Sequence, residues 1–148
     1  MRAMEKKIGF ELLPHTADIT VRAVGRSLEE AFAYAVIGLF GVMTNVESIE
    51  PREKREVTAE GFDLENLLYN FLEKILFLFD TEQFLVSRVD NIAIEPQPDG
   101  YRVKATVSGE RFDPERHESK VLVKAITYHG MRIYQEGGLY VVEYTPDI

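Results

Sequence analysis

Two acidic positions near opposite ends of the sequence offer oxygen atoms that could bind a hard divalent cation. Asp18 closes the segment His15-Thr16-Ala17-Asp18, and Asp147 and Ile148 are the last two residues. Ca²⁺ and Mg²⁺ prefer carboxylate and carbonyl oxygens, and Ile148 could contribute a terminal carboxylate or a backbone oxygen. Simpler interpretations stay open, because an Asp in a turn often accepts backbone hydrogen bonds and a chain end is often frayed. Asp18 and Asp147 could face each other if the strand expected at 139–144 lies beside the strand expected at 19–24.

A second group of chemically active side chains lies between residues 109 and 129. It combines cations, histidines and hydroxyl groups, among them Arg116, His117, Lys124 and His129. A loop of this composition above the end of a sheet could contact a ligand or a partner. A solvated loop with ordinary ion pairs would have the same composition. The sequence leaves both interpretations open.

Several classes of chemistry find no support in the sequence. It has no cysteine, so a thiolate nucleophile, a disulfide and a cysteine-ligated zinc are excluded. It contains no G-x-S-x-G, P-loop or G-x-G-x-x-G motif. The three histidines are far apart in sequence, so a zinc site would need the fold to bring them together. The net charge of −8 argues against direct nucleic-acid binding, which needs clustered Lys and Arg, and suits a basic partner or cations.

Hydrophobic periodicity predicts two long amphipathic helices, at about 28–43 and 64–79. In each segment apolar residues recur at the i, i+3, i+4, i+7 spacing of one helical face. Ser27 with Glu30 has the pattern of a capping box, and Asp63 is a second candidate N-cap. Extended segments are expected around these helices at 10–13, 19–24, 57–60, 84–86, 91–95, 101–108, 121–128, 131–136 and 139–144. His129-Gly130 is a candidate hairpin turn between the strands at 121–128 and 131–136.

The order of these elements predicts an α+β fold. We expect two layers, with a mostly antiparallel sheet and both helices packed on one of its faces. The 148 residues fit a single domain spanning 1–148. No apolar run approaches the roughly 20 residues that a membrane helix needs, and residues 1–10 lack a signal-peptide core. We therefore expect a cytoplasmic protein without a membrane partner.

The sequence resembles the archease family along nearly its whole length. The order and spacing of four segments carry this resemblance. The first is His15 to Ile19 with the helix that follows Ser27, and the second is Asp63 to Asp80. The third is Gly109 to His129, in which the matching residues are Glu110, Asp113, Arg116, His117 and Val123 to His129, and the fourth is the terminal Asp147-Ile148. Tyr144-Thr145-Pro146 departs from the plainer final strand expected of the family.

The resemblance implies an accessory protein and not an enzyme. Archeases assist the RNA ligase that joins tRNA halves, promote formation of the guanylyl–ligase intermediate and support multiple turnover. The family's cation site corresponds here to Asp18, Asp147 and Ile148, with Ca²⁺ as the expected ion and Mg²⁺ or Mn²⁺ as alternatives. Contact with the ligase or a phosphate is expected at His15, Arg116, His117, Lys124 and His129.

Two other functions compete with this one. A metal-dependent phosphohydrolase would need a general base near the cation, for which His15 and His117 are candidates. A chaperone-like interaction module would act through an exposed face of the second helix.

Overall fold

The computed structural model describes residues 8–15 and 18–148, and these contain seven strands, two long helices and one short 3₁₀ helix. The two long helices have the predicted positions, and α1 has the predicted bounds. In chain order the elements are β1 (Gly9–His15), β2 (Asp18–Gly25), α1 (Leu28–Met43), η1 (Val46–Ser48), β3 (Glu53–Gly61), α2 (Leu64–Glu82), β4 (Phe84–Gln97), β5 (Gly100–Arg111), β6 (Arg132–Glu136) and β7 (Leu139–Tyr144).

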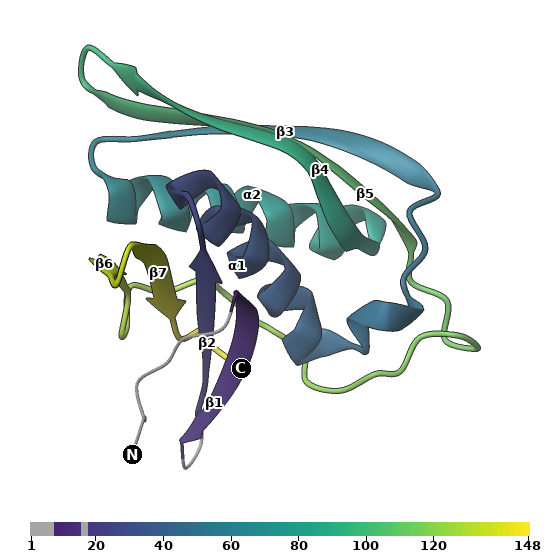
Figure 1. The fold of residues 1–148 in the computed structure, drawn as a ribbon. Helices are drawn as coiled ribbons and strands as arrows, with labels where there is room; N and C mark the ends of the chain where they lie inside the picture. Colours follow the sequence, from purple (N-terminus) through teal and green to yellow (C-terminus); the bar gives the residue numbers. More distant parts are fainter. Residues whose placement is uncertain (1–7, 16–17) are drawn as a thin grey trace.

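The strands form two antiparallel sheets, and the helices lie between them (Figure 1). One sheet has the order β1-β2-β7-β6 and the other the order β3-β5-β4. Helix α1 packs against β2 and β4, one strand of each sheet, whereas α2 packs mainly against β3. The α+β class, the antiparallel pairing and the two packed helices are confirmed. The expected single sheet is replaced by two, because residues 112–131 carry the chain from β5 to β6 on the other side of the helices.

The helix ends follow the predicted capping residues. The hydroxyl of Ser27 accepts a hydrogen bond from Glu30 N–H at 3.0 Å, and Glu30 Oε1 accepts one from Arg26 N–H at 2.6 Å. The carboxylate of Asp63 accepts a bond from Asn66 N–H at 2.8 Å. These side chains satisfy N–H groups that the helix itself leaves without partners. Helix α2 runs three residues past the predicted Phe79.

The apolar stripes of both helices form one core with the inner faces of the sheets. The rings of Phe32 on α1 and Phe71 on α2 are stacked with centroids 6.2 Å apart. Both rings are fully buried, as are Val21 on β2 and Val103 on β5. The predicted apolar stripes therefore do form the core, and this core joins both sheets through the helices. None of the helices within residues 8–15 and 18–148 is long and apolar enough to cross a membrane.

The strand predicted at 121–128 is wrong, and with it the hairpin, but the predicted turn at His129-Gly130 is present and is closed by a hydrogen bond from Met131 N–H to the Tyr128 carbonyl at 3.0 Å. The segment 121–128 is irregular, and its one strand-like contact is an isolated antiparallel bridge between Ala125 and Asp147. Its apolar, β-branched composition resembles a strand, but its backbone groups bind elsewhere. The N–H groups of Lys120 and Val121 donate to the last carbonyls of α1, at 2.9 and 3.2 Å. The pieces expected at 84–86 and 91–95 are instead one strand, β4, with two register shifts.

Candidate functional site

Strand β2, which begins at Asp18, lies beside β7, the last strand before Asp147, and the sequence left this adjacency open. Strand β2 pairs antiparallel with β7, with Val21 opposite Tyr144. One step further, the hydroxyls of Thr20 and Thr145 are 2.7 Å apart. The strand pairing ends at Val21 and Tyr144; the same register carried on past it would put Asp18 opposite Asp147, on one face of the sheet. Both Asp residues are exposed.

The last two residues are held against the rest of the fold. Asp147 N–H donates to the carbonyl of Ala125 at 2.9 Å, and its own carbonyl accepts from Lys124 N–H at 2.7 Å. The side chain of Ile148 packs against the hydrophobic core. The last two residues are therefore not frayed, because two backbone hydrogen bonds and an apolar contact fix their position.

Asp18 and His129 line the same surface groove, of about 640 Å³, beside the β2–β7 pair. Its two arginines are already paired with carboxylates, Arg22 with Glu11 and Glu143 and Arg132 with Glu143. The Glu143 carboxylate accepts from Arg22 Nε at 2.9 Å and from the Tyr134 hydroxyl at 3.0 Å, and Arg132 lies 3.8 Å away. Burial and the Glu143 hydrogen bond both raise the pKa of Tyr134. The groove therefore offers little free positive charge to a phosphate.

The carboxylates of Asp18 and Asp147 have no ion pair or side-chain hydrogen bond within the part of the chain that the structure describes. The oxygen atoms that Asp18, Asp147 and Ile148 offer are the kind of donor that Ca²⁺ or Mg²⁺ prefers, and not a softer metal. Water would have to complete the coordination. Among the described residues no group of three or more His, Cys, Asp or Glu side chains converges.

Arg116 and His117 lie in a different place, in a network around the buried Glu110. Nε2 of His117 is 2.8 Å from Glu110 Oε2, and its Nδ1 accepts a hydrogen bond from Asp113 N–H at 2.8 Å. Since Nδ1 accepts, Nε2 carries the proton and donates to Glu110. The His117 side chain is fully buried. Contact of this imidazole with a phosphate stays a prediction, and it would require the buried ring to become exposed and to give up at least one of these hydrogen bonds.

Glu110 is the centre of this network. Its carboxylate accepts from Arg116 Nη2 at 2.5 Å and from Glu50 N–H at 2.8 Å, and Arg52 Nε lies 3.1 Å away. Burial raises the pKa of Glu110, but the hydrogen bonds from Arg116, Glu50 N–H and His117 outweigh it and hold the pKa at about 2. The carboxylate thus ties the end of β5 to the loops before β3 and after β5. Sequence reasoning missed this role. The signal was an acidic residue at the end of an apolar strand, followed by Arg116 and His117.

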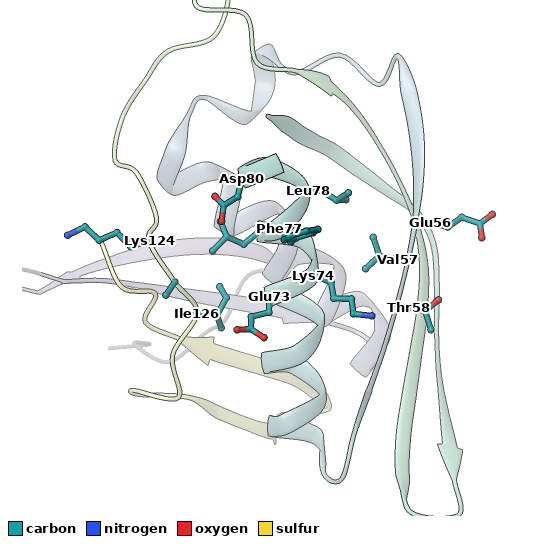
Figure 2. A pocket seen from close by; sticks show the side chains of 12 residues that line it. Glu56, Val57, Thr58, Glu73, Lys74, Phe77, Leu78, Asp80, Lys124 and Ile126 are labelled. Carbon is teal, nitrogen blue, oxygen red and sulfur yellow. The ribbon is translucent and has the colours of Figure 1, made fainter. Parts of the chain in front are cut away.

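The remaining predicted contact residues are divided between surfaces. Lys124 is exposed, and with Asp80 it lines a groove along α2 (Figure 2). His129 is exposed beside Asp18. The main chain of His15 pairs with that of Asp18, but its side chain lies outside the described residues. The fold thus joins the main chains of Lys124 and Asp147, places Asp18 and His129 in one groove, and leaves Arg116 and His117 elsewhere.

Comparisons with known proteins agree with this architecture. A sequence model of the archease protein family matches residues 10–148. The archease of Pyrococcus abyssi is 50% identical over 140 residues, which cover 94% of this chain and 98% of that protein. The archease of Sulfurisphaera tokodaii is 42% identical over 139 residues, again covering 94% and 98%.

Two solved structures share the fold. The solution structure of a Methanobacterium thermoautotrophicum protein is 36% identical, with a TM-score of 0.80 over 95% of this chain and 99% of that one. The crystal structure of a Thermotoga maritima protein, described as an archease and possible chaperone, has a TM-score of 0.62 over both full chains at 20% identity. The match over residues 10–148 and the identity to full-length relatives mean that this chain belongs to the archease family.

Proposed function

We propose that this protein activates the RNA ligase of tRNA splicing, promoting ligase guanylylation and multiple turnover, by holding a divalent cation at Asp18, Asp147 and Ile148. Ca²⁺ is the expected ion. The observation that supports the proposal is the pairing of β2 with β7, whose register, carried past Val21 and Tyr144, would place two unneutralised carboxylates opposite each other. Asp147 is held there by its main-chain bonds to Lys124 and Ala125.

The chain's own residues would position charge for the ligase. Phosphoryl-type transfer gains from positioned positive charge more than from a covalent nucleophile, and a bound divalent cation supplies that charge. Asp18 and Asp147 would hold the ion through carboxylate oxygens. Exposed His129 in the adjoining groove and Lys124 beside Asp147 would contact the ligase or its nucleotide. The acidic surface suits a basic protein partner better than RNA.

A guanylylation time course of the cognate ligase tests this proposal. We expect the wild-type protein to increase the initial rate of guanylylation and the number of ligation turnovers. Asp147→Asn should lose most of the stimulation while keeping its far-ultraviolet circular dichroism spectrum. Glu115→Gln, at an exposed carboxylate of the 112–131 loop, is the matched control and should stimulate like wild type. Full stimulation by a folded Asp147→Asn variant would refute a role for the cation site.

A chaperone-like role is the second candidate, and one observation favours it. The outer face of α2 is not covered: the Phe77 side chain is 63% exposed, and Glu73, Lys74 and Asp80 are exposed around it. Suppression of aggregation of a heat-denatured substrate protein, measured by light scattering, tests this role. Phe77→Ser should remove the suppression, and guanylylation should not depend on Phe77 if the two roles are separate. Nucleotide hydrolysis by the protein alone with Mg²⁺ or Mn²⁺ would instead support a phosphohydrolase.

A further inference from the structure

A second groove, of about 710 Å³, runs along the outer face of α2 (Figure 2). One wall is the middle of β3, at Glu56, Val57 and Thr58, and the opposite wall is segment 124–126. Phe77 on α2 is the large exposed apolar side chain between them. This α2–β3 groove shares no lining residue with the groove beside Asp18.

Strand β3 presents a free edge to this groove. It is an edge strand of the β3-β5-β4 sheet, and within the described residues it pairs with β5 alone. The carbonyl of Glu60 accepts a bond from Asn70 Nδ2 at 2.7 Å, and that of Lys54 accepts one from Arg55 Nη1 at 2.8 Å. These two carbonyls therefore lie on the side away from β5.

The same edge has unused main-chain groups in its middle. Alternate residues of an antiparallel strand direct their N–H and C=O groups to the same edge. Glu56 and Thr58 are an even number of residues from Lys54 and Glu60 along the strand. Their main-chain N–H and C=O groups therefore point away from β5 as well. Side chains cap the edge near its two ends, but no such bond reaches Glu56 or Thr58 in the described part of the chain. A free strand edge of this kind is a template for pairing with another strand.

The charges around the groove indicate what kind of segment would fit. Its charged lining is mixed, and within the described residues none of these side chains forms an ion pair: Glu56, Glu73, Asp80, Lys74 and Lys124. The other acidic residues near this edge are neutralised: Glu82 by Arg55 at 2.9 Å and Glu60 by Arg102 at 3.0 Å. A strand laid along the edge would place its side chains beside Glu56, where Lys or Arg is favoured.

A second copy of this chain is a poor occupant of the groove. If the β3 edges of two copies paired, the unpaired Glu56 of one copy would lie against the acidic edge of the other. Each copy also carries a net charge of −8. Like charges facing each other across paired strands are destabilising. The acidic edge thus acts against self-association while leaving a basic strand free to bind.

We propose that an extended segment of a protein partner, in which Lys or Arg alternates with apolar residues, binds in the α2–β3 groove as a fourth strand beside β3. Its main chain pairs with Glu56 and Thr58, its apolar side chains cover Phe77 and Val57 on the helix side, and its cations, on the opposite face, lie beside Glu56. The opposite wall, at Lys124 and Ala125, also binds the main chain of Asp147. A partner held here therefore lies next to the segment that fixes Asp147, although binding requires no cation and no ligase activity.

The test uses a seven-residue peptide of alternating Lys and Val, blocked at both ends, titrated into isotope-labelled full-length protein and followed by amide NMR. We expect the resonances of Val57, Thr58 and Phe77 to shift. A peptide of alternating Glu and Val should bind at least tenfold more weakly. Methylation of the peptide nitrogens on the pairing edge should remove binding, because it removes the donors that bind β3. Absence of any shift at β3 with millimolar peptide would overturn the proposal.

A pair of variants separates strand addition from simple adhesion to the apolar surface. Thr58→Pro removes the outward N–H while leaving the bonds between β3 and β5, a position at which an edge strand tolerates proline. Thr58→Ala keeps the N–H and is the matched control. We expect Thr58→Pro to lose at least tenfold in affinity and Thr58→Ala to bind like wild type, with both showing a folded spectrum. Equal affinities of the two variants would overturn the strand-addition proposal.

Discussion

Replacement of Glu110 by Gln should reveal how strongly one buried carboxylate stabilises this fold. The Glu110 side chain is 5% exposed and accepts hydrogen bonds from Arg116, Glu50 N–H and His117. Gln keeps the size of the side chain but removes the negative charge. It leaves the Arg116 and Arg52 guanidiniums, which are partly exposed, without a carboxylate between them.

The size of the effect follows from the pKa of Glu110. The pKa in the folded protein is about 2, against an ordinary value of 4.5. Because folding lowers the pKa, the stabilisation is complete above pH 4.5 and is lost as pH falls toward 2. By linkage, this group alone contributes roughly 3 kcal/mol at neutral pH, of which about 2 kcal/mol is lost by pH 3. Solvent around the partly exposed arginines makes these figures upper values.

Urea denaturation at pH 7 and pH 3 measures both the stabilisation by Glu110 at neutral pH and the part of it that is lost in acid. We expect Glu110→Gln to lower the free energy of unfolding at pH 7 by about 2–3 kcal/mol. Between pH 7 and pH 3, wild type should lose about 2 kcal/mol more than the variant, since only wild type can protonate this group. Asp90 also has a pKa of about 2, but it titrates in both proteins and cancels in the difference. Identical pH dependence of the two proteins would refute this account of Glu110.

Three further changes test other parts of the structure. Asp147→Asn should weaken binding of Tb³⁺, used as a luminescent substitute for Ca²⁺, at least tenfold, and unchanged affinity would exclude this carboxylate as a ligand. Tyr144→Phe should cost about 1–2 kcal/mol in urea denaturation, because the buried hydroxyl that donates to the Ala35 carbonyl at 2.7 Å is lost. Phe71→Ala should cost about 3–5 kcal/mol in the same assay, since its fully buried ring stacks on Phe32 and would leave a cavity between the helices.

The helices could be predicted from the sequence because local signals determine them. The apolar stripe of α1 begins after the Ser27 cap and ends at Met43, where Thr44 leaves helical geometry. The same logic identified the start of α2 at Asp63. Its end was placed three residues early because no glycine marks it. Gln83 takes the left-handed conformation that usually favours glycine, with φ of 56°.

The division into two sheets could not be predicted, because it depends on contacts between residues far apart in sequence. The segment 121–128 has the composition of a strand, yet its backbone binds the end of α1 and Asp147. The role of His117 was also beyond local reasoning. A histidine followed by charged residues suggested an exposed contact, whereas its two nitrogens bind Glu110 and Asp113 in the interior.

The proposed cation site depends on the same kind of long-range pairing, and this determines how it should be tested. Asp18 and Asp147 lie near the two ends of the sequence, and the order β1-β2-β7-β6 is what brings β2 beside β7, the last strand before Asp147. Deletion of the last two residues would remove the Asp147 carboxylate. It would also free the backbone of Lys124 and Ala125, which form a wall of the α2–β3 groove, and uncover the core contact of Ile148. Loss of activity after truncation would therefore not distinguish the cation site from the groove. Asp147→Asn keeps every main-chain bond of this segment, so it separates the carboxylate from the structure that holds it.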